Sequence, residues 1–155
     1  MNNITAQDLM IGDIVDVHRS ECVADGGHYM QWNEYGKIVC ITDCYITIKY
    51  IGREDDYSLE DVEEKDINPI PLTAEILEKN GFVKSYGVSD TPPYDQDEEG
   101  NMYYSFKGEH KFWGWWQPDN TYYIPANAMG DIVIKHVHQL QHALKLAGIE
   151  KTIEL

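Results

Sequence analysis

Three histidines near the carboxyl end, His136, His138 and His142, are the side chains whose type and spacing could most directly do chemistry. Neutral imidazole is a common metal ligand. Two histidines four residues apart lie on one face of a helix, as helical metal ligands often do. His138 and His142 therefore form a candidate metal site, and with it a candidate metal-dependent enzyme.

The neighbours of these histidines argue against that reading. In a continuous helix His136 would lie roughly 160° around the axis from His138, so the three rings could not share one ion. Lysines share the face of the remaining pair, no glutamate completes an HExxH motif, and a zinc site needs further ligands. We therefore expect no metal, no cofactor and no enzyme. We expect His138 and Gln141 to tie the start of the last helix to the sheet by hydrogen bonds.

The densest aromatic segment spans residues 112–123 and is the best candidate for binding a ligand or partner. In a strand, Trp113 and Trp115 would share one face and Phe112 and Trp116 the other. One face should be core, and the other could stack against a sugar or peptide or form an interface. Packing of the segment against the last helix is the alternative. The candidate binding residues are Trp113, Trp115, Trp116, Tyr122 and Tyr123.

The charge of the chain narrows the classes of partner. Twenty-seven acidic residues face twelve Lys and Arg, giving a formal charge of −15. Binding to nucleic acid or to an anionic membrane depends on cationic side chains, so neither is expected. A protein partner is expected, and a basic protein would suit the charge. Three cysteines and an amino-terminal stretch without signal-peptide features indicate the cytoplasm.

The order of predicted elements indicates an α+β protein with two regions. Residues 1–68 contain short β-branched strands joined by turns, which predicts a small SH3-like β-barrel. The two prolines in residues 67–72 mark an extended connection. In residues 69–155 we expect a helix at about 72–80, strands within 82–125 and at 131–135, and a helix at about 137–147 packed on an antiparallel sheet. Thr73 should cap the first of these helices and Asn80-Gly81 should end it.

Three segments in this order carry a resemblance to a known family: DLMIGDIV (8–15), INPIPLTAEILEKNGF (67–82) and IKHVHQLQHALKLAGIE (134–150). Together they resemble a family of small uncharacterised proteins from gut Bacteroidetes and their phages and mobile elements. The pattern of that family runs DLRIGN, then PIPLT-E-L-K-GF, then IKYVHQLQNLYFALTGEEL. The resemblance spans about residues 8 to 150, and its central segment is the strongest match.

The resemblance implies a shared fold but no reaction. His138, Leu140 and Gln141 match its last segment, whereas His142 replaces an asparagine and His136 an aromatic residue. We therefore expect a non-catalytic accessory or protein-interaction protein, associated with phages or mobile elements. The alternatives are a small-ligand or carbohydrate-binding module that uses the Trp113–Trp116 segment, and a metal-dependent enzyme that uses His138 and His142.

Overall fold

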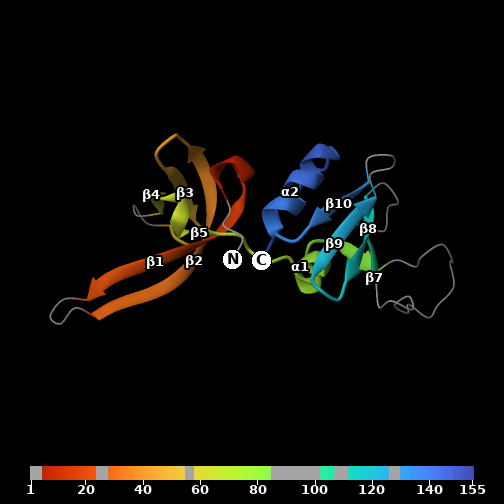
Figure 1. Ribbon diagram of the computed structural model, residues 1–155, viewed down its shortest axis with the longest axis horizontal. Helices are drawn as coiled ribbons and strands as arrows, with labels where there is room; N and C mark the ends of the chain where they lie inside the picture. Colours follow the sequence, from red (N-terminus) through yellow and green to blue (C-terminus); the bar gives the residue numbers. More distant parts are fainter. Residues whose placement is uncertain (1–4, 24–27, 55–57, 85–101, 107–111, 126–129) are drawn as a thin grey trace. The chain divides into compact units, whose positions relative to one another are not determined.

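The chain forms two compact units, Met1–Ile70 and Pro71–Leu155. The computed structural model describes residues 5–23, 28–54, 58–84, 102–106, 112–125 and 130–155. Within these residues each unit contains a five-stranded antiparallel sheet, and helices are few and short (Figure 1). The expected α+β class is therefore confirmed.

The first unit is a meander whose last strand returns beside its first. Its sheet has the order β4-β3-β2-β1-β5. The strands are β1 (Ile14–Val23), β2 (His28–Ile41), β3 (Ile46–Tyr50), β4 (Leu59–Val62) and β5 (Ile67–Asn68), and the 3-10 turns are η1 (Ala6–Asp8) and η2 (Glu64–Asp66).

The sheet of the first unit is open, so the closed SH3-like barrel expected from the sequence is not shown. A closed barrel needs both edge strands paired with each other. Within the described residues β4 pairs only with β3, and β5 pairs only with β1. β5 is two residues long, and Pro69, which has no amide donor, follows it.

Alternation along the strands builds the core of the first unit. In β3 and at the start of β1 every second residue points inward, and the resulting cluster is almost entirely aliphatic. It consists of Leu9, Val15, Val17, Ile38, Ile46, Ile48, Tyr50, Val62 and Ile67. Gly36 leaves room for this packing, because a Cβ there would lie 2.0 Å from Cγ2 of Ile48.

β2 is one continuous strand of 14 residues that passes through the polar residues Asn33 and Glu34. Both side chains are hydrogen-bonded, and the strand continues through them. Asn33 Nδ2 donates to Asp16 Oδ2 (2.7 Å), and Glu34 accepts hydrogen bonds from Arg53. Satisfied polar side chains are compatible with a continuous strand.

The second unit has a sheet in which every strand neighbours the next strand along the chain, in the order β10-β9-β8-β7-β6. α1 begins after Thr73, whose side chain accepts from the amide of Ile76, and ends at Asn80. The elements are α1 (Ala74–Lys79), β6 (Phe82–Lys84), β7 (Met102–Phe106), β8 (Trp113–Gln117), β9 (Thr121–Pro125), β10 (Asp131–Ile134) and α2 (Val137–Leu146).

Aromatic rings fill the core of the second unit. Phe82 contacts the rings of Phe106, Phe112 and Tyr122 edge to face, at centroid distances of 5.4, 5.9 and 6.0 Å. Such geometry is favourable because the positive edge of one ring meets the negative face of another. Gly114 permits this packing, since a Cβ there would lie 2.8 Å from Cζ of Tyr122.

The last helix packs through one apolar stripe, as its 3.6-residue period predicts. Val137, Leu140 and Leu144 are fully buried. Val133 lies outside this stripe: it belongs to β10 and is 45% exposed, whereas its neighbour Ile134 is fully buried. No helix in the described parts of the chain has the length and hydropathy that a membrane span requires.

Asn80 fixes the end of the chain to the end of α1. Its side chain donates to the carbonyls of Ile76 and Glu154 and accepts from the amide of Glu154, at 2.7–2.8 Å. Asn80 is only 1% exposed, and Ile153 beside this connection is 2% exposed. The backbone of Glu154 is therefore hydrogen-bonded to the Asn80 side chain, in the way that a strand is bonded to its neighbour in a sheet.

We expect Asn80→Ala to lower the free energy of unfolding of the second unit by about 2 kcal/mol, because the amide and carbonyl of Glu154 lose their partner, whereas the carbonyl of Ile76 keeps the backbone amide of residue 80. Urea denaturation followed by tryptophan fluorescence measures the change. The control is Asn68→Ala, at an exposed position of β5, which should change stability by less than about 0.5 kcal/mol. Equal effects of the two substitutions would contradict this role of Asn80.

Candidate functional site

One face of the second sheet carries apolar and aromatic side chains, with the buried Ser105 between Val83 and Trp113. Because residues directly opposite on paired strands point to the same side, the strand register identifies its members. Trp115 lies opposite Tyr103 on one side and Tyr123 on the other, and Tyr123 lies opposite Val133. We call the set Val83, Tyr103, Trp113, Trp115, Tyr123 and Val133 the outer aromatic face.

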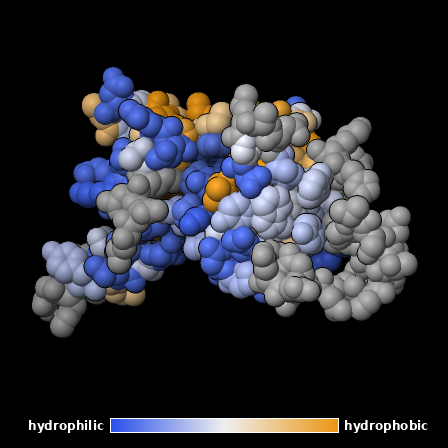
Figure 2. All heavy atoms as spheres, turned by 45° about the vertical axis from the view of Figure 1, so that its right-hand side comes forward, coloured by the Kyte–Doolittle hydropathy of each residue, from blue (hydrophilic) through white to orange (hydrophobic). Residues whose placement is uncertain are grey.

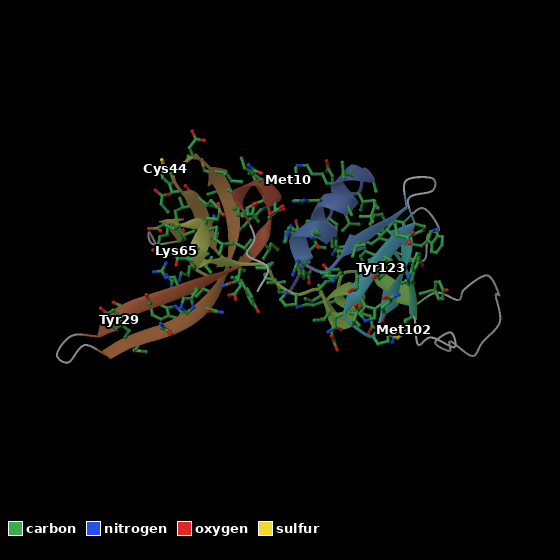
Figure 3. All side chains as sticks on the ribbon, viewed as in Figure 1. Met10, Tyr29, Cys44, Lys65, Met102 and Tyr123 are labelled. Carbon is green, nitrogen blue, oxygen red and sulfur yellow. The ribbon has the colours of Figure 1, made fainter. Side chains whose placement is uncertain are left out.

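The outer aromatic face is open to solvent at its margins and half-buried at its centre. Val83 is 51% exposed, Val133 45% and Trp113 39%, whereas the three central rings are half-buried. Figure 2 shows a group of pale side chains, neither strongly hydrophilic nor hydrophobic, on the visible side of this unit. Tyr123 is labelled on the sheet in Figure 3.

Two of the five candidate aromatic residues lie on the opposite face of the sheet, in the core. Trp116 is 3% exposed and Tyr122 is fully buried. The hydroxyl of Tyr122 donates to the carbonyl of Tyr104 at 3.1 Å, and burial raises the pKa of Tyr122 well above its usual range. The sequence therefore placed binding candidates on both faces, and the structure leaves Trp113, Trp115 and Tyr123 on the outer one.

The central rings of the outer aromatic face stack on each other. Trp115 and Tyr123 lie with centroids 5.5 Å apart and planes within 6° of parallel. Each ring therefore covers one face of the other, which reduces the flat surface available to a sugar ring. Trp113, the most exposed of these rings, is the side chain best placed to meet a ligand.

The three histidines come together at the start of α2. His136 precedes the helix as its N-cap residue, in extended conformation. Its ring stacks on that of His138 at 5.7 Å, and His138 meets His142 edge to face at 5.8 Å. Among the described residues, no three His, Cys, Asp or Glu side chains are arranged to hold a metal ion.

Gln139 ties the start of α2 to the preceding strand. Its Oε1 accepts from the amides of Lys135 (2.8 Å) and His136 (3.2 Å). Sequence reasoning missed this residue, although glutamine three positions after an N-cap is a known helix-start signal. His138 is 3% exposed and Gln141 is half-buried. The hydrogen-bonding role expected of that pair stays a prediction.

The first unit contains a network of ion pairs and cation–π contacts that the sequence did not predict. The guanidinium groups of Arg19 and Arg53 lie 5.2 and 4.9 Å from the ring centroid of Tyr50. Arg53 binds both carboxylate oxygens of Glu34, at 2.6 and 2.8 Å, and Arg19 pairs with Glu60. Because its members come from distant positions, only the strand register brings them together.

This network sits at the base of a two-stranded arm. β5 pairs with β1 only through Asp16 and Val17, and β3 pairs with β2 only from Gly36 onward. The rest of the β1–β2 hairpin extends beyond the other strands (Figure 1). Tyr29, labelled near the far end of the arm in Figure 3, is 68% exposed, and Met30 is 61% exposed.

No protein-family model, no curated protein and no solved structure matches the chain.

The half-buried position of His136 makes the second unit sensitive to acid. Burial, with a smaller contribution from Lys135, lowers the pKa of His136 below its usual value of 6.5. As the pH falls, His136 is therefore protonated near pH 6.5 in the unfolded chain but only at a lower pH in the folded chain. We expect the free energy of unfolding to fall as the pH decreases through about 6.5 and to level off below the folded pKa.

The comparison of the native chain with His136→Asn isolates this effect, because asparagine keeps a favourable N-cap residue without titrating near neutral pH. Urea denaturation between pH 8 and pH 5 should show a steeper loss of stability in the native chain than in the variant. Asn68→Ala, which removes no titratable group, is the control and should retain the native slope. Parallel curves for the native chain and His136→Asn would disprove the assignment.

Proposed function

We propose that the protein is a non-catalytic accessory protein that acts by binding another protein. The outer aromatic face is the observation that carries this proposal. An antiparallel sheet commonly packs one face on the core and exposes the other face to water. Here the second face has Trp113, Val83 and Val133 exposed around half-buried rings, and exposed apolar groups of this kind mark interaction surfaces.

The charge of the chain supports a basic partner. Its formal charge is −15, and acidic surfaces attract basic proteins over distances of about a Debye length. Cytoplasmic action is part of the proposal, and the free thiols of Cys40 and Cys44 are consistent with a reducing compartment. The association with phages or mobile elements rests on the family resemblance. We also propose that residues 1–68 are an open relative of SH3-like sheets.

Co-purification from the native host tests the proposal. We expect a basic protein to be retained by the native chain, and its binding to weaken at least tenfold when Trp113→Ser and Val133→Ser are combined. The reason is that Trp113 and Val133 are exposed apolar side chains whose area an interface on this face would bury. Isothermal titration with the isolated partner measures the loss.

The matched control is Tyr35→Ser, which removes a 48% exposed aromatic side chain from the first unit. It should leave binding unchanged. A strictly partner-free protein, or equal binding by the native chain and the double variant, would contradict the proposal.

A carbohydrate-binding module is the second candidate, because Trp113 is 39% exposed on a face that also carries Tyr103 and Tyr123. In that case we expect glycans to shift the tryptophan emission of the native chain and not that of Trp113→Ser. Titration with a panel of soluble oligosaccharides measures this. A flat response across the panel would count against the module, and the stacking of Trp115 on Tyr123 favours that outcome.

A further inference from the structure

One edge of β2 has no neighbouring strand among the described residues. The amide of Ile51 donates to the carbonyl of Tyr35 at 2.9 Å, and this is the last bond that β2 makes on the β3 side. Residues Tyr29–Asn33 pair with β1 on their other side only. Within the part of the chain that the structure describes, the opposite edge of this stretch is therefore open.

The carbonyl of Tyr35 shows which residues point their backbone groups at the open edge. In an antiparallel strand the N–H and C=O groups of one residue point to one side, and those of the next residue to the other. Tyr29, Gln31 and Asn33 therefore share the direction of Tyr35. Their amides and carbonyls form an unpaired row, which is a template for a further strand.

This edge lacks the features that usually protect an exposed strand. Natural edge strands carry lysine, other charges or proline that discourage pairing. The stretch HYMQWN, residues 28–33, contains no acidic residue, no Lys or Arg and no proline, in a chain with 27 acidic residues. Its side chains Tyr29 and Met30 are 68% and 61% exposed.

We propose that this edge pairs with the same edge of a second copy of the chain, antiparallel and about a two-fold axis at Gln31. Gln31 then lies opposite Gln31 of the other copy, and the two residues exchange backbone hydrogen bonds. Tyr29 of each copy lies opposite Asn33 of the other, and these two residues also exchange backbone hydrogen bonds. Met30 lies opposite Trp32, where the strands are closest and a thioether meets an indole ring.

The pairing of β1 with β2 places charged side chains of β1 next to Met30 and Trp32. Glu21 lies beside Met30 in the hairpin, and Arg19 lies beside Trp32 with its guanidinium 5.9 Å from the ring. In the paired copies a row on one face therefore runs from Glu21 and Met30 of one chain to Trp32 and Arg19 of the other. The two rows are equivalent by the two-fold axis, so the contact uses the same surface on both copies.

A second copy suits this edge better than a basic segment of another protein. Residues 28–33 carry no Asp, Glu, Lys or Arg, and at the base of the arm Glu34 is bound by Arg53 and Arg19 is paired with Glu60. The open edge itself therefore offers no acidic group to a basic segment, despite the acidity of the whole chain. The same ion pairs, on either side of Tyr50, fix the base of the arm, so little ordering is needed on association.

The contact is short, so a reversible dimer is expected. Pairing over five residues extends about 17 Å and falls below the size of a standard stable interface. Association should appear between about 1 µM and 1 mM. Sedimentation velocity over this concentration range measures the mass of the native full-length chain.

Gln31→Pro removes the central amide of the open edge without removing a bond to β1, since that amide points away from β1. Ser20→Pro is the matched control, because Ser20 lies directly opposite Gln31 and points its amide at the other edge of the hairpin. We expect the native chain and Ser20→Pro to dimerise and Gln31→Pro to remain monomeric. A native chain that stays monomeric at about 1 mM, or a Gln31→Pro variant that dimerises as the native chain does, would overturn the proposal.

Cysteine cross-linking checks the partner and the register. Across the proposed axis the two residues at position 31 have Cα atoms about 5.5 Å apart, which a disulfide can span. Under mild oxidation Gln31→Cys should give a covalent dimer well above the background of the native thiols, and Ser20→Cys should not. Cross-linking through position 20 instead of 31 would reject this edge as the contact.

Discussion

The alternation of side chains along β8 is the constraint on which the candidate site depends. A strand turns successive residues to opposite sides, so the dense aromatic segment cannot be wholly core or wholly surface. Trp116 is buried with Tyr122, while Trp113 and Trp115 point the other way. Gly114, between Trp113 and Trp115 in the chain, has no side chain and so lets the ring of Tyr122 approach β8. The same run of aromatic residues therefore supplies side chains both to the core and to the outer aromatic face.

The histidines illustrate how an element boundary changes chemistry. A helix continued through residue 136 would separate His136 from His138, whereas the observed helix starts at Val137. The extended backbone at His136 brings its ring onto that of His138. The result is a set of stacked rings held in place by Gln139, with a lowered pKa at His136. Burial favours the neutral ring, which gives this group a role in stability at mildly acidic pH.

The two units present different kinds of surface. The second unit exposes apolar side chains on a sheet face, where binding would come from the burial of rings and branched side chains. The first unit exposes backbone groups along a strand edge, where binding would come from hydrogen bonds and register. The Arg19, Tyr50 and Arg53 group matters for the latter, because cation–π contacts and ion pairs support an arm that a two-stranded hairpin alone would hold weakly.

The sequence by itself determined the α+β class, the cap of α1 at Thr73 and the end of that helix at Asn80-Gly81, because these depend on neighbours a few residues apart. Only the tertiary structure decided which strand edges are left open, where Arg19 and Arg53 meet Tyr50, and how Asn80 holds residue 154. Those contacts join positions that are distant in the chain, and strand register, which the sequence pattern does not fix across long separations, sets them.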